Sequence, residues 1–174
     1  MENNQPKVGK IILTYGSLSA AIGIIFVFML YSQDMHYQGG WMVFGISALI
    51  SIATIVLGML QFKKENGGFM SFGQALKIGM GIGLFAGIIG IVFQLILGNV
   101  IDPEMMTKSM EYQRIQLEEN SNLDSNQIEA QLEFSKKFST PGVQAAFGFI
   151  FILVTSFIYS LIPALILKKN ENFN

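Results

Sequence analysis

Residues Ser71 to Gly98 read SFGQALKIGMGIGLFAGIIGIVFQLILG, and this stretch decides the fold. Its only charged residue is Lys77, and it is long enough to cross the hydrocarbon core of a bilayer as one helix. Gly79, Gly83 and Gly87 recur every four residues, so they lie on one face of that helix. In lipid, a face of small residues lets a second helix approach closely, and van der Waals contact then holds the pair together. We therefore interpret these three glycines as helix-packing residues.

The rest of the chain contains three more apolar blocks of similar length. Of its 174 residues, 51% are hydrophobic and 13% charged, and the mean hydropathy is +0.48. The blocks predict transmembrane helices over about residues 11–31, 41–62, 74–98 and 142–167, too long and too uniform for barrel strands. We expect an all-α integral membrane four-helix bundle, forming one membrane domain over residues 1–174. Four helices need internal contacts, so we favour packing of the glycine face within the chain over packing between copies.

The first apolar block could be mistaken for a signal peptide. Its apolar run is longer than a usual signal-peptide core, and no cleavage site with small residues follows it. We therefore expect it to be the first membrane helix.

A polar segment separates the third and fourth blocks. Residues 99–140 contain eight acidic and four basic side chains. Asp102 followed by Pro103 is typical of a helix start, and Asp124 with Gln127 predicts a capping box. Apolar residues recur at roughly helical spacing, so we expect an amphipathic insertion over about residues 102–138. It is either two helices or one long kinked helix, and it rests on the membrane surface or on the bundle.

The basic residues outside this segment indicate the orientation of the chain. The bases near the termini and the second loop are Lys7, Lys10, Lys63, Lys64, Lys77, Lys168 and Lys169. The short loop of residues 32–40 has none. The positive-inside rule therefore places both termini in the cytoplasm and the amphipathic segment outside.

Few side chains are candidates for chemistry. The chain has no cysteine, which excludes disulfides, thiolate metal sites and cysteine nucleophiles. Asp34 and His36 share a loop at a spacing that could hold a metal, but one histidine makes a weak site, and we expect an exposed surface loop. The glycines of residues 79–83 lack the strand and Gly-Lys-Ser/Thr ending of a phosphate loop. We expect no catalytic, cofactor-binding or metal-ligating residues, no cofactor and no nucleic-acid partner.

Polar side chains inside the apolar blocks allow two interpretations. They are Gln94, Thr155, Ser156, Tyr159 and Ser160. They could line a groove for a small solute, or they could form hydrogen bonds between helices with tyrosine at the interface. We favour the second interpretation.

The segment GGFMSFGQALKIGMGIG, together with four spans and a polar insertion before the last, resembles the domain-of-unknown-function family 4199. The resemblance covers nearly the whole chain and is most recognisable in residues 68–75. It implies a small, mostly bacterial integral membrane protein without an established activity, in the inner membrane of a Gram-negative cell. It supplies no catalytic residues.

Two functions are compatible with these features. The first is a non-enzymatic inner-membrane protein that acts through helix packing or partner contacts. The second is a small-solute transporter or channel subunit that assembles as an oligomer. The expected partners are the lipid bilayer and either further copies of the chain or another membrane protein. A water-filled path would favour transport, whereas a dry, fully packed interior would count against it.

Overall fold

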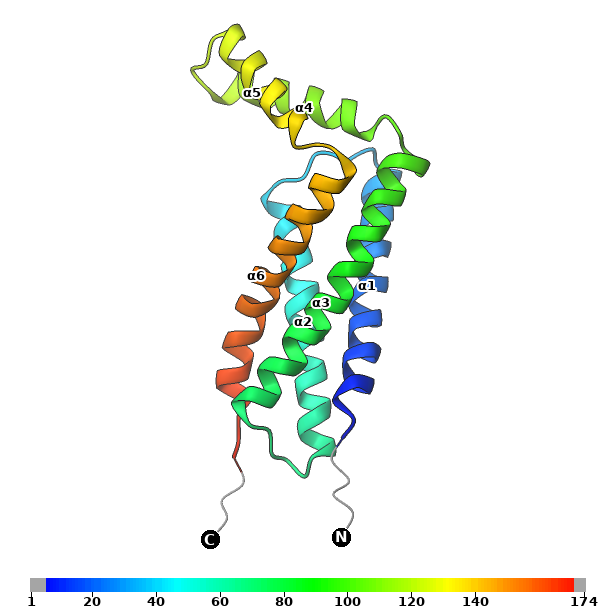
Figure 1. Cartoon of the computed structure of the whole chain (residues 1–174), viewed down its shortest axis with the longest axis vertical. Coiled ribbons are helices and arrows are strands. Elements are labelled where there is room, and N and C mark those ends of the chain that lie inside the picture. Colours follow the sequence, from blue (N-terminus) through cyan, green and yellow to red (C-terminus); the bar gives the residue numbers. More distant parts are fainter. Residues whose placement is uncertain (1–5, 171–174) are drawn as a thin grey trace.

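The computed structural model describes residues 6–170, and that part of the chain is almost entirely helical (Figure 1). The elements are α1 (Val8–Ser32), α2 (Trp41–Glu65), α3 (Phe72–Ile96), the π-helical segment η1 (Leu97–Ile101), α4 (Met105–Asn120), α5 (Ser125–Lys137) and α6 (Pro141–Leu167). Over residues 6–170 the only extended pairing is an isolated bridge between Met70 and Lys169. The expected all-α fold, with a helical insertion before the last long helix, is confirmed.

Four of the helices are long and apolar enough to cross a membrane: α1, α2, α3 continued through η1, and α6. A helix of 25 residues, such as α1, is about 38 Å long, and the hydrocarbon core is about 30 Å thick. Each helix can therefore span the core and project beyond it. The chain is thus a membrane protein, with four spanning helices in residues 6–170.

The start of α3 is determined by residues that are close together in the sequence. The Gln74 backbone N–H donates to Ser71 Oγ at 3.3 Å, and the Ser71 N–H donates to Gln74 Oε1 at 2.8 Å. This reciprocal pair is a capping box, which satisfies two backbone donors that a helix start otherwise leaves free. Just before it, Gly67 and Gly68 turn the chain with positive φ angles of 65° and 89°, a conformation that favours glycine.

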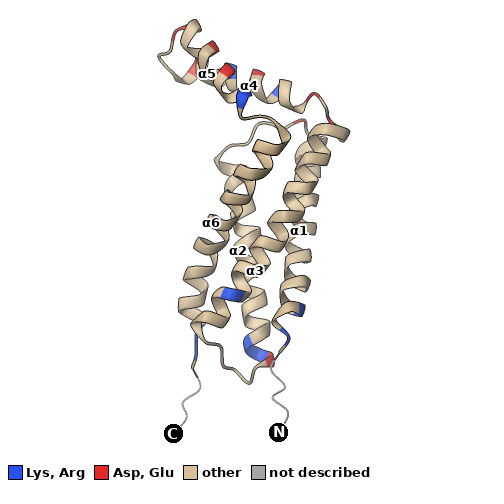
Figure 2. Cartoon of the chain, viewed as in Figure 1, with Lys and Arg blue, Asp and Glu red and all other residues tan. Residues whose placement is uncertain are grey.

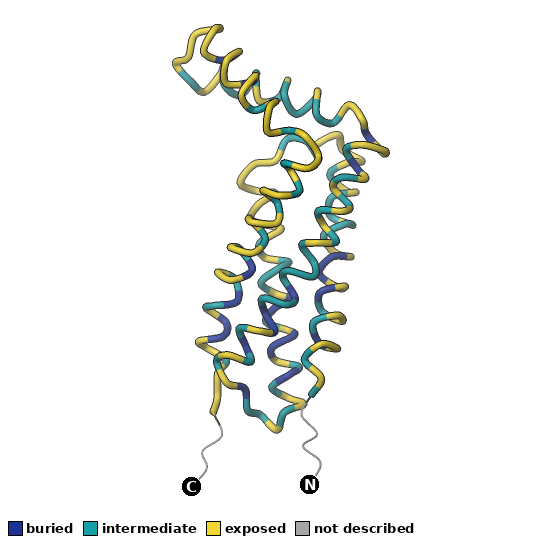
Figure 3. Tube along the Cα trace, in the orientation of Figure 1, coloured by how far each residue is buried: buried dark blue, intermediate teal, exposed yellow. Residues whose placement is uncertain are grey.

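Helix α3 lies at the centre of the bundle and packs against α1, α2 and α6. The buried core lies towards the end of the bundle where the described chain begins and ends, which we call the termini end (Figure 3). Its largest fully buried side chains are Ile55, Met59, Phe62, Met70, Ile78 and Ile82. The opposite end carries α4 and α5, and we call it the hairpin end. There the four helices are more exposed, so close packing is concentrated in one half of the bundle.

A backbone clasp closes the termini end. The N–H of Met70 donates to the carbonyl of Lys169 at 2.9 Å, and the N–H of Lys169 donates back to Met70 at 2.8 Å. Lys63 Nζ donates to the carbonyl of Leu167, the last residue of α6, at 2.9 Å. These bonds join the loop after α2 to the end of α6.

Helices α4 and α5 form an antiparallel hairpin that crosses the end of the bundle and extends sideways beyond α6 (Figure 1). Asp124 and Gln127 form the predicted capping box at the start of α5. Ile128 and Leu132 of α5 are buried. The insertion is therefore two helices, which are separated by residues 121–124.

The ends of the bundle differ in charge (Figure 2). Basic side chains gather at the termini end, whereas the acidic side chains lie mainly on the hairpin. The long helical walls between them are nearly free of charge, as expected for surfaces in contact with lipid.

Candidate functional site

The glycine face of α3 lies directly against α6. A Cβ atom at Gly79 would come within 2.5 Å of Ser160 Oγ, and one at Gly83 within 2.8 Å of Ser156 Cβ. A Cβ atom at Gly87 would meet Ile152 Cδ1 at 2.7 Å. Glycines every four residues on α3 thus meet side chains every four residues on α6. How much these glycines contribute to helix packing stays a prediction.

Nearer the hairpin end, the four long helices line a partly open cavity of about 280 Å³. All four contribute to its wall: α1 through Gly23, α2 through Phe44, α3 through Gly90 and α6 through Phe151. Its inner boundary is formed by Ile55 and Ile82, which are fully or almost fully buried in the core. The cavity is therefore closed towards the termini end. We call it the bundle cavity.

The wall of the bundle cavity is mostly apolar but includes several polar side chains. They are Ser19, Ser47, Ser51, Gln94, Thr155, Ser156 and Tyr159. Two of these hydroxyls donate to carbonyls in their own helix: Ser51 to Ser47 at 3.0 Å and Thr155 to Phe151 at 2.8 Å. The Gln94 amide contacts Met105 Sδ at 3.9 Å, a weak interaction. The cavity could therefore bind a molecule mainly through apolar contacts, and Gln94 is the one amide side chain in its wall.

Sequence reasoning identified the polar residues of the third and fourth apolar blocks, but not which neighbours they contact. Ser156 and Ser160 are buried against the glycines of α3, and Ser160 Oγ donates to the Ser156 carbonyl at 2.6 Å. Thr155, Tyr159 and Gln94 line the bundle cavity, and Ser156 borders it as well as the glycines. Small residues on the first two helices, such as Gly23 and Ser47, also contribute to its wall, and sequence reasoning did not identify them as site residues.

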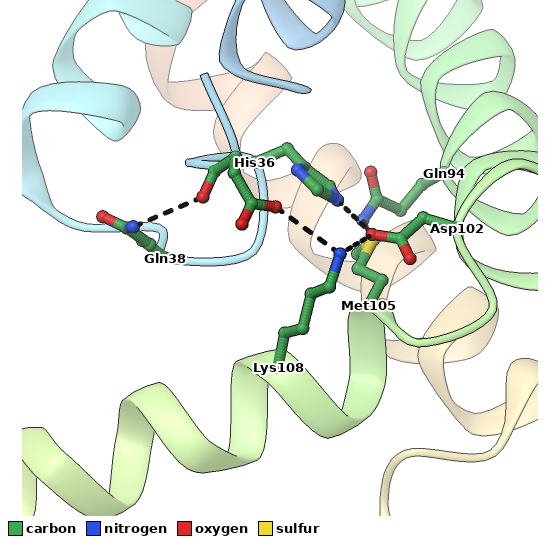
Figure 4. Close-up of polar contacts among 7 residues, drawn as sticks. His36, Gln38, Gln94, Asp102, Met105 and Lys108 are labelled. Atoms are coloured by element: carbon green, nitrogen blue, oxygen red, sulfur yellow. Dashed lines mark hydrogen bonds and ion pairs between the residues drawn. The ribbon is translucent and has the colours of Figure 1, made fainter. Parts of the chain in front are cut away.

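A polar cluster joins the loop between α1 and α2 to the start of the hairpin (Figure 4). His36 Nε2 donates to Asp102 Oδ2 at 2.9 Å, and Lys108 Nζ donates to the same oxygen at 3.1 Å. Lys108 Nζ also lies 3.5 Å from Asp34 Oδ1. The His36 ring makes edge contacts with Tyr31 and Tyr37. We call His36, Asp102, Lys108 and Asp34 the hairpin anchor.

Two expectations about this region are wrong. His36 was expected on an exposed loop, but its side chain has no exposed area because aromatic rings and Asp102 cover it. Asp102 was expected to cap the next helix, but α4 begins at Met105 with Glu104 at the cap position. The Asp102 carboxylate instead accepts hydrogen bonds from His36 and Lys108. Only the Asp102 backbone carbonyl accepts from the Met105 N–H, at 3.0 Å.

The anchor stabilises the charged forms of Asp102 and Lys108. Burial raises the pKa of Asp102, but hydrogen bonds from Lys108 and His36 outweigh it, and the pKa lies below the ordinary 3.8. The hydrogen bond to Asp102 raises the pKa of Lys108 above the ordinary 10.5. Around neutral pH the pair is therefore a carboxylate and an ammonium ion.

The described residues hold no group of three or more side chains that could bind a metal ion. Between Asp102 and Asp34, the position a cation would favour is taken by the Lys108 ammonium group. The glycines of residues 79–83 lie within the continuous helix α3, so they form no phosphate-binding loop. In the part of the chain described here, the bundle cavity is the most developed candidate for a binding site.

Comparison with known proteins identifies a family but no activity. No curated protein and no solved structure matches the chain significantly. A family model described as "Protein of unknown function (DUF4199)" matches residues 14–169, which include all four spanning helices and the hairpin almost in full. The resemblance noted from residues 68–75 is thereby confirmed, and the chain belongs to this family.

Proposed function

We propose that this protein is a non-enzymatic component of the bacterial inner membrane that binds a small apolar or amphipathic molecule in the bundle cavity. The observation that carries the proposal is the cavity itself, about 280 Å³ in volume and walled by all four helices. Small-molecule sites are typically concave and mostly apolar, with few polar groups, and measure roughly 300–1,000 Å³. The bundle cavity has this character, and its volume lies just below the lower end of that range.

The polar groups of the cavity support binding over chemistry. Thr155 Oγ1 donates to the Phe151 carbonyl, and Ser51 Oγ donates to the Ser47 carbonyl. A nucleophilic hydroxyl would instead contact a base within hydrogen-bond reach. Among the polar side chains of the wall, Gln94 can both donate and accept, so it is suited to orient a ligand.

Cavity-filling variants provide the test. A Cβ atom at Gly90 or Gly23 would meet no heavy atom within 4 Å, and both residues line the cavity. Gly90→Leu and Gly23→Leu should therefore fill the cavity without forcing the helices apart. Gly45→Leu is the matched control, because Gly45 has equal space but lies outside the cavity wall.

The measurement is mass spectrometry of small molecules extracted from the purified full chain. We expect the parent and Gly45→Leu to retain the same apolar compound and both cavity-filling variants to lose it. Equal retention by all four proteins would place the ligand elsewhere and exclude this function.

An oligomeric transporter or channel subunit is the second candidate, and the same cavity favours it. The buried residues Ile55 and Ile82 close the cavity at its inner boundary, so transport would need a change in helix packing or a path between copies. A solute flux in reconstituted vesicles that Gly90→Leu abolishes would support transport. Retention of a ligand without flux would support binding alone.

Partner contacts with another membrane protein remain a third prediction, testable by affinity purification from the native membrane.

A further inference from the structure

A row of aromatic rings runs from the hairpin onto the lipid-facing side of the bundle. Phe134 and Phe138 of α5 lie 4.8 Å apart between ring centroids, and Phe138 lies 6.1 Å from Phe147 of α6. The three residues are 62%, 44% and 59% exposed. Exposed phenylalanines on the hairpin are thus continuous with an apolar helix wall that a membrane surrounds.

Past Phe147, two half-exposed aromatic residues that also line the bundle cavity lead to a marker of the membrane interface. Phe151 lies one helical turn after Phe147, and its ring is 6.5 Å from that of Phe44. The Phe44 ring is in turn 6.4 Å from that of Trp41, which is 89% exposed at the start of α2. Exposed tryptophan at the end of a spanning helix is typical of the headgroup region. The hairpin phenylalanines therefore lie near the depth at which the bilayer surface begins.

The phenylalanine face of α5 excludes acidic side chains. By helical spacing, Phe134 shares its face with Gln127, Ala130, Gln131 and Phe138. Glu129 and Glu133 lie away from this face, while Ile128 and Leu132 are buried. Lys137 follows Phe134 by three residues and is its neighbour on the helix surface. Apolar rings beside a flexible cation are typical of a helix that lies in a lipid interface.

We propose that α5 docks on the lipid surface at the hairpin end, with Phe134 and Phe138 inserted among the headgroups and upper acyl chains. The hairpin extends sideways past α6, which brings it over the lipid next to the bundle (Figure 1). A protein partner would also cover exposed phenylalanines. Continuity of these rings with the lipid-facing side of α6 favours lipid. The inference is independent of any ligand in the bundle cavity.

Single-tryptophan reporters test the docking. The chain has one tryptophan, so Trp41→Phe removes the native signal. Into this background we introduce Phe134→Trp, Phe138→Trp or Glu129→Trp, the last being exposed on the same helix but away from the phenylalanine face. Each full-length protein is reconstituted in nanodiscs of plain phosphatidylcholine or of phosphatidylcholine brominated near the top of its acyl chains.

Brominated lipid should lower the fluorescence of Phe134→Trp and Phe138→Trp and leave Glu129→Trp nearly unchanged. Two reporter positions keep the test valid if one substitution disturbs the hairpin. Absence of quenching at both positions would overturn the proposal. If those same reporters were also shielded from aqueous acrylamide, the face would be covered by protein. Equal quenching of all three reporters would likewise overturn the docked orientation.

Discussion

At the scale of single residues, Gly83 is the most demanding position in the bundle. An added Cβ would meet both the Ser156 side chain and its backbone Cα, the latter at 3.3 Å. A backbone atom cannot move aside as a flexible side chain can, so a larger residue must separate α3 from α6. We expect Gly83→Leu to lower stability in detergent by about 1–3 kcal/mol, the range for overpacking. Thermal unfolding of the purified protein measures this change.

The control for Gly83→Leu is Ile88→Ala on the same helix. Ile88 is 47% exposed and so faces the surroundings of the bundle. Leu84, on the same helix, is less exposed and would be a poorer lipid-facing control. Ile88→Ala should change stability little, because lipid replaces the contacts of the lost side chain. If Gly83→Leu were as stable as the parent, the glycine face would not be needed for helix packing.

Asp102 gives a second prediction at this scale. Asp102→Asn removes the charge that Lys108 and His36 share, and its side chain is only 8% exposed. We expect the anchor to weaken by about 1–3 kcal/mol, the range for a buried group that loses its partner. Hydrogen exchange at the start of α4 should become faster. Glu104→Gln, a neighbouring acid that makes no ion pair among the described residues, should leave exchange unchanged.

The pH dependence of the Asp102 contribution follows from the lowered pKa. A carboxyl whose pKa is lower when folded contributes stability that is fully present above its unfolded value, here near 3.8. That contribution is lost as the pH falls through the lower folded value. The protection factor at the start of α4, which corrects for the intrinsic pH dependence of amide exchange, should thus stay constant down to about pH 4 and fall only below it. A protection factor that fell already between pH 7 and 5 would contradict this assignment.

The residue scale also shows where sequence reasoning stops. The four-residue spacing of Gly79, Gly83 and Gly87 is local, so it predicts a shared helix face. Nothing in that spacing selects α6 as the neighbour. His36 and Asp102 are 66 residues apart, and each has an ordinary local role as loop residue or helix cap. Their pairing depends on the fold of the whole chain.

At the scale of elements, helix starts were the most predictable features. The capping boxes at Ser71 and Asp124 involve residues only three positions apart, and both form. Thr140 occupies the cap position of α6 with Pro141 next, but its side chain makes no capping bond. The π-helical segment η1 after α3 has no sequence signature that we recognised, and it moves the start of the hairpin beyond Asp102.

Helix α5 gives the prediction at this scale. Asp124 Oδ1 accepts from the Gln127 N–H at 2.9 Å, so Asp124→Ala leaves that donor without its partner. Loss of such a cap typically costs about 0.5–2 kcal/mol of helix stability. Hydrogen exchange in nanodiscs should become faster in the first turn of α5. Asn122→Ala, in the same exposed turn, should have no effect, and an equal response from both variants would show that Asp124 has no special role.

At the scale of the whole molecule, length and hydropathy were sufficient to predict four spanning helices, because crossing lipid imposes both. The uneven packing along the bundle was not predictable. Small residues recur along α1, α2 and α3, and the sequence does not distinguish those that meet a neighbour from those that border the cavity. Gly16 faces Phe85 closely, whereas Gly23, on the same helix, faces open space in the cavity wall.

The orientation in the membrane is the last prediction, and it rests on charge. Lysines gather at the termini end and the hairpin is mainly acidic, so the positive-inside rule places both termini in the cytoplasm (Figure 2). Because the chain has no cysteine, single substitutions can report exposure without background. Ser125→Cys, exposed at the start of α5, should react with a membrane-impermeant thiol reagent in intact spheroplasts. Asn170→Cys, exposed beyond α6, should react only after permeabilisation. The reverse labelling pattern would show that the protein has the opposite orientation in the membrane. The phenylalanines of α5 would then dock on the cytoplasmic leaflet.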